Sequence, residues 1–445
     1  MGTHYNSIPI PSNKVYLYTF GCQMNEHDSE RIAGLLDTAG YRFVSREEQA
    51  DIILFNTCSI RETAEQRVYG RVTQLKPLKK LKPHLIIGLC GCMAEKYQQE
   101  LFKNLPIIDF VIGPRQWMRL KDTLDAVIRT RQQRVVCGTD MPVQSPQSIK
   151  RDSRIKAWVS IMEGCDNFCS YCVVPYVRGR QVSRPLTEIR IELEQLAKQG
   201  YKEITLLGQN VNSYQHKGMG FADVIRSVNQ IDGIHRFRYM TSHPRDFNLE
   251  TIQAILDSPK FCEQFHLPIQ SGSDAILARM NRGYTIKHYL NLVHEIRARF
   301  PTASITTDII VGFPGETESE YQKTVTLMQS VQWDSAFLFM FSPREGTKAA
   351  TLESQIPVSI RKQRIQEVVA LQKQISATKL RQLIGSSTEI LIEGLSKHKP
   401  NQWIGRTRQN VVVVFTANKT MQPGDLITVT ITDASAFTLF ARWNT

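Results

Sequence analysis

The sequence predicts an α/β protein with three successive domains: an N-terminal doubly wound parallel α/β domain, a central partial (β/α)6 barrel and a C-terminal small antiparallel β-barrel. Three observations indicate this order. Short apolar runs alternate with helical stretches in the first third, the same rhythm continues through the middle, and short strands dominate the end. A chain of 445 residues is also too long for one ordinary domain.

The first domain is expected at residues 14–138. Apolar runs predict strands at 15–20, 51–56, 85–90 and 107–112, and helical periodicity is found at 26–39, 61–81 and 94–104. Runs rich in Val, Ile and Leu between helices are typical of a parallel sheet covered on both faces. The polar stretch 139–153, which contains Pro and Ser, then predicts a linker.

The central domain is expected at residues 154–378. Its predicted strands are 157–162, 203–208, 236–241, 264–269, 304–312 and 336–341, and its predicted helices are 186–199, 221–230, 249–257, 285–299 and 317–331. Six such units fit an open or partial barrel, whose active site lies at the C-terminal ends of the strands.

The last domain is expected at residues 379–445, where a basic helical stretch at 359–384 gives way to strands. The predicted strands are 388–395, 403–408, 410–415, 426–432 and 437–443, and residues 423–425 (PGD) form a turn. About five strands in roughly 60 residues suit a small β-barrel of the oligonucleotide-binding type.

The composition, 42% hydrophobic and 22% charged, is that of a globular protein with sizeable cores. No apolar run reaches the roughly 18 residues of a membrane span, and residues 1–14 lack the apolar core of a signal peptide. We therefore expect a cytoplasmic protein that does not use a membrane. The net charge of +13 favours an anionic partner, with nucleic acid first and a membrane surface second.

Residues 164–174 (GCDNFCSYCVV) hold Cys165, Cys169 and Cys172 directly after a predicted strand. In a cytoplasmic chain with only nine cysteines, clustered thiols indicate metal binding rather than disulfides. Three thiolates can hold three irons of a [4Fe–4S] cluster and leave the fourth open. A three-ligand catalytic zinc site is the structural rival, although this spacing is unusual for zinc.

A C-x3-C-x2-C run on the first strand–helix loop of a partial barrel resembles the radical S-adenosylmethionine (SAM) superfamily. The resemblance implies a [4Fe–4S] cluster whose open iron binds SAM and whose electron cleaves SAM to a 5′-deoxyadenosyl radical. Tyr171 matches the family's aromatic position near the adenine. Further SAM contacts are expected where strands end, in LLGQN (206–210), LPIQSGS (267–273) and DIIVGFPGE (308–316), at Gln209, Gln270, Ser271, Gly312 and Glu316. Gly312 and Gly315 are equally consistent with ordinary turns.

A second set of cysteines follows the predicted strands of the first domain. Cys22, Cys58 and Cys92 come after successive strands, and parallel strands end at one edge of a sheet. Three thiols could therefore converge there, although cysteines are also buried as small hydrophobes. Cys90 competes with Cys92, because period-two alternation puts both on one face. Cys137 and Cys262 stand alone and are expected to be structural.

The combination of both cysteine sets with a C-terminal β-barrel resembles the methylthiotransferases, over residues 14–442. The resemblance selects Cys92, in GCMA (91–94), and makes the last domain similar to a TRAM domain, a small RNA-binding barrel. The phrases FGCQMNEHDSE (20–30), NTCSIRE (56–62) and YCVVPYVRGRQVSRP (171–185) resemble the branch that acts on N6-isopentenyladenosine in tRNA.

This resemblance implies insertion of a methylthio group at C2 of that adenosine, next to the tRNA anticodon. It implies two [4Fe–4S] clusters, on Cys165, Cys169 and Cys172 and on Cys22, Cys58 and Cys92, so that all six are both catalytic residues and metal ligands. SAM would serve twice, as radical source and as methyl donor. An electron donor such as flavodoxin and a monomeric state are expected.

Basic residues support an RNA partner independently. Arg178, Arg180 and Arg184 lie just beyond the SAM-cluster loop, and Arg forks bind phosphate and stack on bases. In the last domain, basic residues interleave with aromatic ones as single-stranded or loop RNA would require: Lys397, Lys399, Arg406, Arg408 and Arg442 among Trp403, Phe415 and Phe437.

Two other functions fit parts of the pattern. A methylthiotransferase acting on threonylcarbamoyl-adenosine in tRNA or on a ribosomal protein would keep both cysteine sets and change only the acceptor. A non-catalytic iron–sulfur carrier or RNA-binding scaffold would explain the cysteines but leave the expected SAM pocket without a use.

Overall fold

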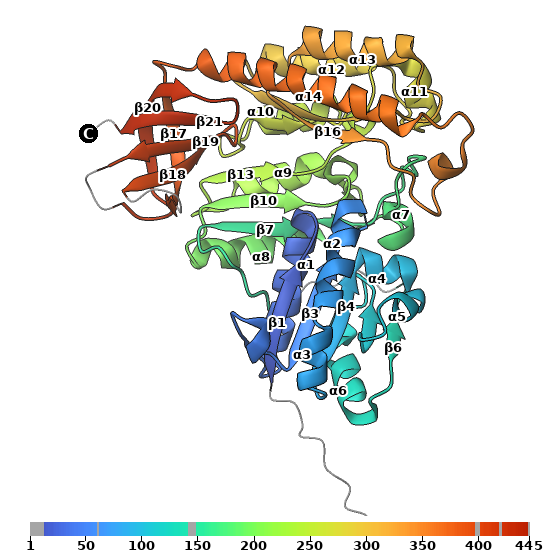
Figure 1. The fold of residues 1–445 in the computed structure, drawn as a ribbon. Coiled ribbons are helices and arrows are strands. Elements are labelled where there is room, and N and C mark those ends of the chain that lie inside the picture. The colour runs from blue at the N-terminus through green and yellow to red at the C-terminus, as the bar shows by residue number, and fades with distance from the viewer. Residues whose placement is uncertain (1–12, 60–61, 141–147, 397–400, 418–420, 444–445) are drawn as a thin grey trace, which may run out of the picture. The chain divides into compact units, whose positions relative to one another are not determined.

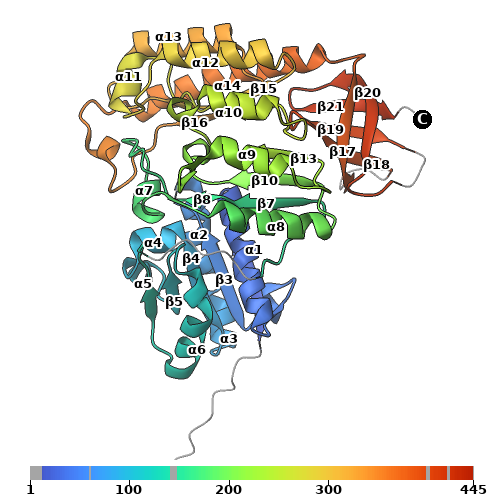
Figure 2. The same ribbon diagram turned by 180° about the vertical axis from the view of Figure 1, so that it is seen from behind.

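A computed structural model describes residues 13–59, 62–140, 148–396, 401–417 and 421–443. The chain forms two compact units (Figures 1 and 2). The first comprises residues 1–152, 162–166 and 172–184, and the second comprises 153–161, 167–171 and 185–445. The predicted SAM-cluster loop is thus shared: Cys165 and Cys172 belong to the first unit and Cys169 to the second.

The first unit is built on a six-stranded sheet in the order β2-β1-β3-β4-β5-β6, in which every pairing is parallel. Its strands are β1 (Lys14–Thr19), β2 (Arg42–Phe43), β3 (Ile52–Thr57), β4 (Ile86–Gly91), β5 (Phe110–Ile112) and β6 (Arg134–Val136). Its helices are α1 (Gln23–Thr38), α2 (Glu62–Gln74), α3 (Lys76–Leu81), α4 (Cys92–Tyr97), α5 (Glu100–Asn104) and α6 (Leu120–Thr130). The predicted doubly wound parallel sheet is confirmed.

Two apolar cores cover the faces of this sheet. Side chains from α2, α4 and α5 pack with one set of strand residues, among them Phe55 and Leu89. Side chains from α1 and α6 pack with the alternate residues, among them Leu54 and Cys90. The alternation follows from the period of two along each strand.

The chain leaves β1 toward β2 on one side and returns to start β3 on the other side. This reversal of strand order makes the C-terminal ends of β1 and β3 the topological switch point, where doubly wound sheets bind their ligands. The elements β2, β6 and α6 were not predicted from the sequence, whereas the strands that flank this point were.

The second unit contains all six predicted central strands, in two three-stranded parallel sheets with the orders β13-β10-β7 and β14-β15-β16. These strands are β7 (Lys156–Ser160), β10 (Glu203–Leu207), β13 (Arg236–Tyr239), β14 (Gln264–His266), β15 (Ser304–Val311) and β16 (Ser335–Met340). The helices between them are α8 (Leu186–Lys198), α9 (Phe221–Asn229), α10 (Leu249–Leu256), α11 (Asp274–Arg279), α12 (Ile286–Arg299) and α13 (Glu318–Val331).

Short elements complete the loops: α7 (Val174–Val177), the strand pairs β8 (Met162–Glu163) with β9 (Val182–Ser183) and β11 (Gln215–His216) with β12 (Met219–Gly220), and five 3-10 turns at 47–49, 117–119, 211–213, 244–246 and 348–351. The basic stretch predicted at 359–384 is helix α14 (Val358–Arg381). In the described residues, no helix is both long and apolar enough to cross a bilayer.

The C-terminal strands close into a barrel in the order β17-β18-β19-β21-β20. They are β17 (Ser387–Leu395), β18 (Gln402–Thr407), β19 (Val412–Thr416), β20 (Leu426–Ala434) and β21 (Thr438–Trp443). The prediction of an antiparallel barrel needs one correction, because β19 and β21 pair in parallel. A Greek-key barrel needs such a pair when its last strand inserts beside a strand of the same direction.

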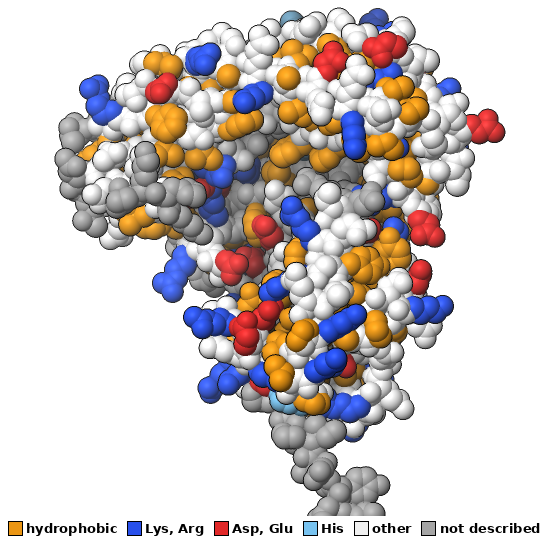
Figure 3. Space-filling view, viewed as in Figure 1, with side chains coloured by type: hydrophobic (Ala, Val, Ile, Leu, Met, Phe, Trp, Pro, Cys, Tyr) orange, Lys and Arg blue, Asp and Glu red, His pale blue; other side chains and the backbone are white. Residues whose placement is uncertain are grey.

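Ion pairs join this barrel to the central strands of the same unit. Arg408 pairs with Glu263 at 2.8 Å, and Lys156 pairs with Glu393. On the face drawn in Figure 3, Lys and Arg side chains are scattered among acidic and apolar ones rather than gathered in one patch. The net charge therefore does not single out one binding surface on that face.

Candidate active site: the cysteines at the strand ends

Three cysteines of the first unit lie at the C-terminal ends of adjacent strands. Cys22 follows β1 and begins helix α1 as its N-cap, Cys58 follows β3, and Cys92 is the first residue of α4 after β4. In the ladder between β3 and β4, Thr57 is paired with Gly91, so Cys58 and Cys92 each come one residue after a matched pair. Neighbouring strands are about 4.8 Å apart, so the register places both cysteines at the same edge of the sheet.

Cys22 is brought to Cys58 by a close approach of the backbone. A methyl group on Gly21, which has φ +152°, would lie 2.7 Å from the Cβ of Cys58 and 2.3 Å from the side-chain oxygen of Asn25. The Sγ of Cys22 donates to Oδ1 of Asn25 at 3.4 Å. Cys58 is buried, and Cys22 is half-buried.

Two asparagines that were not predicted as site residues from the sequence hold this edge of the sheet. Nδ2 of Asn25 donates to the carbonyl of Thr57 at 3.1 Å and to Oδ1 of Asn56 at 3.2 Å. Nδ2 of Asn56 donates in return to the carbonyl of Asn25 at 2.7 Å and to Oγ of Ser29 at 2.9 Å. Both asparagines are fully buried, and a buried amide that satisfies its partners holds the loops around Cys22 and Cys58 in one geometry.

Electrostatics at the three thiols are unequal. A hydrogen bond from Cys58 lowers the pKa of Cys22 to about 6, against the opposing effect of burial and with help from the charge of Arg178. Burial raises the pKa of Cys92, and Arg178 opposes that rise. Thiolates are the metal-binding form of cysteine, so a cation beside these thiols favours metal binding.

The structure separates Cys90 from Cys92. The period-two expectation that both share one face is wrong, because β4 ends at Gly91, whose φ of +92° turns the chain into α4. Cys90 is packed in the apolar core with Phe110 and Ile112, whereas Cys92 contacts Val173 and Val177 of the segment that follows the SAM-cluster loop.

The other two cysteines have structural surroundings, as expected. Cys137 donates to the carbonyl of Ala94 at 3.5 Å, and the fully buried Cys262 accepts from Arg238 at 3.4 Å.

Three cysteines beside a buried arginine are the kind of residues that an iron–sulfur cube would use as its surroundings. Across the described residues, no three His, Cys, Asp or Glu side chains converge on a point where one metal ion would sit. A [4Fe–4S] cube spreads its thiolates over separate irons, so its ligands need not converge in that way. The buried Nη1 of Arg178, which has no hydrogen-bond partner, also suits an anionic group at Cys22 and Cys92.

Cys169, the second-unit member of the SAM-cluster loop, is held by an arginine. Nη1 of Arg282 donates to Sγ of Cys169 at 3.4 Å. The same guanidinium donates to the carbonyl of Pro268 at 2.8 Å and to the hydroxyl of Tyr284 at 3.1 Å. Arg282 is 5% exposed, and these three hydrogen bonds engage all three nitrogens of its guanidinium. Hydrogen bonds to ligating sulfurs are a recognised determinant of cluster potential.

Of the residues predicted to contact SAM, Tyr171 lies in the loop between β8 and α7, and the others lie in the segments that follow β10, β14 and β15. Tyr171 meets Phe313 edge to face, with ring centroids 6.5 Å apart. Gln209 follows β10 and is half-buried. Gln270 has φ +72° and is anchored by its backbone to β15, and the buried Ser271 accepts from the amide of Ser273. Contact with SAM stays a prediction for all of them.

Gly312 and Glu316 belong to one turn after β15. Gly312 has φ +74°, and Oε2 of Glu316 accepts from its amide and from the amide of Phe313. Burial raises the pKa of Glu316 to about 7, against the opposing charge of Arg364. Glu316 therefore shapes the loop that carries Gly312.

The three arginines predicted to contact RNA after the cysteine loop differ in exposure. Arg178 and Arg184 are both 3% exposed, and Arg178 pairs with Asp28 at 2.6 Å. Contact of these two residues with RNA stays a prediction. Arg180 has a 72% exposed side chain and pairs with Asp166 at 2.7 Å.

Arg406 and Arg408 are half-buried and paired with Glu393 and Glu263. Of the aromatic residues around them, Trp403 and Phe415 are core and Phe437 is 66% exposed. Lys397 and Lys399 lie outside the described residues.

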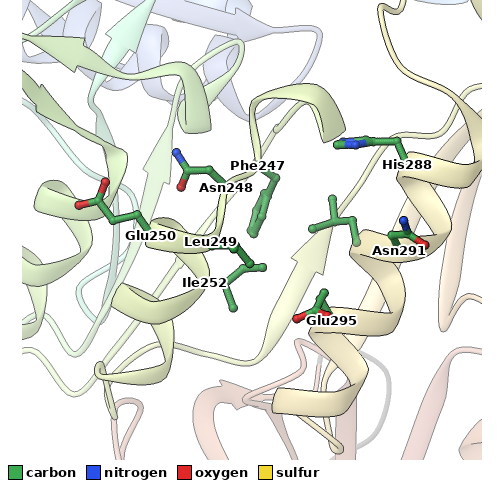
Figure 4. A pocket seen from close by; sticks show the side chains of 9 residues that line it. Phe247, Asn248, Leu249, Glu250, Ile252, His288, Asn291 and Glu295 are labelled. Carbon is green, nitrogen blue, oxygen red and sulfur yellow. The ribbon is translucent and has the colours of Figure 1, made fainter.

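A separate hollow of about 590 Å³ lies between the start of α10 and helix α12 (Figure 4). It is lined by Phe247, Asn248, Leu249, Glu250, Ile252, His288, Asn291, Leu292 and Glu295. None of the predicted site residues lines it.

Known protein families match this chain in three successive ranges, in the same order as the three domains predicted from the sequence. Residues 14–113 match the Uncharacterized protein family UPF0004, residues 159–328 match the Radical SAM superfamily, and residues 381–443 match the TRAM domain. Among solved structures, the radical SAM methyltransferase TsrM from Kitasatospora setae, with cobalamin and a [4Fe–4S] cluster bound, has a similar fold. Its TM-score is 0.58 at 14% identity, over 76% of this chain and 74% of TsrM.

The fold, the cysteine loop and these matches define the class: the protein is a radical SAM enzyme. Curated relatives named tRNA-2-methylthio-N(6)-dimethylallyladenosine synthase are far more similar. That from Natranaerobius thermophilus is 44% identical, covering 96% of each chain, and that from Carboxydothermus hydrogenoformans is 45% identical, covering 95% of this chain and 98% of its own. The chain belongs to this family of tRNA methylthiotransferases.

Proposed function

We propose that the protein inserts a methylthio group at C2 of N6-isopentenyladenosine next to the tRNA anticodon. The observation that carries the proposal is the placement of Cys22, Cys58 and Cys92 at the adjacent ends of β1, β3 and β4. A second thiol set, besides the cysteines of the radical SAM loop, is what a sulfur-inserting enzyme needs in addition to a radical source. The names of the relatives support the tRNA acceptor.

Each cysteine set has its own role in this proposal. A [4Fe–4S] cluster on Cys165, Cys169 and Cys172 would supply the electron that cleaves SAM, and a cluster on Cys22, Cys58 and Cys92 would hold the sulfur to be transferred. The chain's own residues orient these ligands. The buried Asn25–Asn56 pair fixes the strand ends, and Arg282 fixes Cys169.

The substrates follow from this assignment. SAM would be bound by Tyr171 and the strand-end residues of the second unit, and would act both as radical source and as methyl donor. The adenine C2–H bond has no useful acidity, so a radical route is needed where an acid–base side chain would fail. The partners we propose are tRNA and an electron donor such as flavodoxin, for a cytoplasmic monomer.

An iron count tests the cysteine assignment. Anaerobic reconstitution should give about eight irons per chain if both cubes form. The triple variant Cys22→Ala, Cys58→Ala, Cys92→Ala should keep about four irons and SAM cleavage while losing methylthiolation. Cys90→Ala is the matched control, since Cys90 is packed in the core one residue before Gly91 and should keep all eight. Eight irons in the triple variant would refute the assignment.

A product assay tests the acceptor. Reconstituted enzyme would be incubated without oxygen with SAM, a reductant and an isopentenylated anticodon stem-loop, and the digested nucleosides would be analysed by mass spectrometry. A nucleoside that gains a methylthio group in place of one hydrogen supports the proposal. SAM cleavage without that product would instead favour threonylcarbamoyl-adenosine or a ribosomal protein as acceptor, and no SAM cleavage would favour a scaffold.

A further inference from the structure

Arg178 is a buried cation at the edge of the sheet where the three cysteines lie. It follows α7, whose residue Val177 packs against Cys92 together with Val173. Its side chain is 4% exposed, and Nη2 donates to Oδ2 of Asp28 at 2.6 Å. Nη1 is buried and has no hydrogen-bond partner in the described protein.

A buried guanidinium nitrogen without a hydrogen-bond partner lowers the stability of the folded protein. A buried charged donor that lacks an acceptor loses its hydration without compensation, and buried charges are normally paired. Asp28 satisfies one end of the fork, but its Oδ1 also faces Arg31 at 3.5 Å. The remaining anion of this network, Glu163, is bound to Arg31. The Arg178–Asp28 pair therefore leaves Nη1 of Arg178 for a further acceptor.

The charges around Arg178 indicate where that acceptor lies. Burial would lower the pKa of Arg178, but the charges of Asp28, Cys92, Cys22 and Glu163 raise it. Arg178 in turn opposes the effect of burial on the pKa values of Cys22 and Cys92. These are the side chains that the proposed function assigns to the sulfur-carrying cluster. A cluster held by three thiolates, with a further sulfide bound, is anionic, and Arg is the residue best suited to a buried anion.

We propose that Arg178, held in place by Asp28, is a positioning residue for the sulfur-carrying centre at Cys22, Cys58 and Cys92, and that its free arm hydrogen-bonds the sulfur bound there. The inference rests on the proposed function, since it needs a cluster at these cysteines. It reassigns the arginine that the sequence pattern had placed on an RNA surface. Arg178 keeps an anionic sulfur in place until transfer, without touching RNA.

The test uses the full chain with Cys165, Cys169 and Cys172 replaced by Ala, so that only the sulfur-carrying centre can bind iron. The midpoint potential of that cluster is followed by electron paramagnetic resonance, and sodium sulfide is titrated to obtain an apparent Kd for hydrosulfide. In the Arg178→Gln variant, about four irons remain, the midpoint shifts to a more negative potential, and the Kd rises about tenfold or more. Arg178→Lys, which keeps the charge but not the fork, should restore the potential more than the Kd.

Arg31→Gln is the matched control. Arg31 is equally buried and belongs to the same network, but its ion pairs are with Glu163 at 2.5 Å and Asp28 at 3.5 Å. An equal shift in Arg31→Gln, or unchanged potential and Kd in both Arg178 variants, overturns the inference. If Arg178→Gln loses its iron, Arg178→Lys decides by the same two readouts. Failure of the parent variant to bind four irons would instead refute the proposed function, and this inference with it.

Discussion

Arg408 offers a direct test of whether the C-terminal barrel uses its arginines for RNA or for docking. Its Nε lies 2.9 Å from Oε2 of Glu263, and its Nη2 lies 2.8 Å from Oε1. Nη2 also donates to the carbonyls of Pro259 (2.9 Å) and Phe261. Four acceptors from the segment before β14 thus engage two of the three guanidinium nitrogens. This pattern predicts that Arg408 fixes the small barrel to the central strands.

The magnitude follows from the geometry of the pair. Fully exposed ion pairs contribute roughly 0.2–1 kcal/mol, and bidentate Arg–carboxylate pairs contribute more. Because the Arg408 and Glu263 side chains are only 24% and 25% exposed, we expect a coupling energy of about 1–2 kcal/mol. A double-mutant cycle with Arg408→Gln and Glu263→Gln, followed by denaturant unfolding, measures it.

RNA binding separates docking from phosphate contact. Each phosphate contact adds roughly 0.7–0.9 to the slope of log K against log salt. Arg408→Gln should therefore leave the slope for an anticodon stem-loop unchanged, even if affinity falls. Arg180→Gln is the contrasting variant, because its side chain is 72% exposed, and its slope should fall by about that amount. A fall of the same size in Arg408→Gln, with no coupling to Glu263, would refute the docking interpretation.

Three further predictions concern acid stability, the SAM cluster and a turn. Burial alone would raise the pKa of Glu203, but its buried partner Arg238 and Lys156 lower it from 4.5 to about 2. It therefore contributes about 3 kcal/mol above pH 4.5 that is lost as pH falls toward 2. Glu203→Gln should accordingly flatten the decline of unfolding free energy between pH 5 and pH 3. In a chain that keeps only the SAM cluster, Arg282→Lys should lower the midpoint potential of that cluster by up to roughly 60–130 mV. This range is the equivalent of one charge-assisted hydrogen bond of about 1.5–3 kcal/mol. An unchanged midpoint potential in a redox titration would contradict this prediction. Gly91 has φ +92°, and a methyl group there would lie 2.5 Å from the Thr57 carbonyl oxygen, so Gly91→Ala should reduce the iron count by losing the cluster at Cys92. Gly70→Ala, whose methyl group would lie in open space on α2, should leave the iron count unchanged.

The fold was predictable where apolar patterns are long. The strands β3 and β4 are buried at every position, so their runs stand out in the sequence. The strands β2 and β6 have only two and three residues, partly exposed, and their pairing is decided by the neighbouring strands rather than by their own sequence. The parallel β19–β21 pair was missed for a related reason, since strand order depends on contacts that are distant in sequence.

The burial of Arg178 and Arg184 could not be predicted from residue type. Arginine is usually exposed, and a basic run such as VRGRQVSR indicates a surface loop. Only the fold shows that Asp28, 150 residues earlier in the chain, supplies the carboxylate that makes burial of Arg178 possible. Arg180, two residues away, remains exposed. Alternation between buried and exposed arginines is therefore a tertiary property.

The cysteines at the sheet edge show what local sequence does encode. Gly21 and Gly91 directly precede Cys22 and Cys92, and both have backbone angles that side chains disfavour and neighbours too close for a Cβ. A Gly-Cys pair directly after a strand therefore indicates a sharp turn of the chain that places a cysteine at the C-terminal edge of the sheet.

Cys58 is preceded by Thr57 and not by a glycine, and a hydrogen bond from Thr57 takes the place of the glycine turn. Oγ1 of Thr57 donates to the carbonyl of Cys90 at 2.6 Å, so a side chain ties the end of β3 to β4. The two devices place their thiols on one edge by different means: glycine removes a steric barrier, whereas threonine supplies a bond. Because the acceptor is the backbone carbonyl of Cys90, this bond does not depend on the Cys90 thiol, and the strand pairing itself sets the edge from which Cys92 projects.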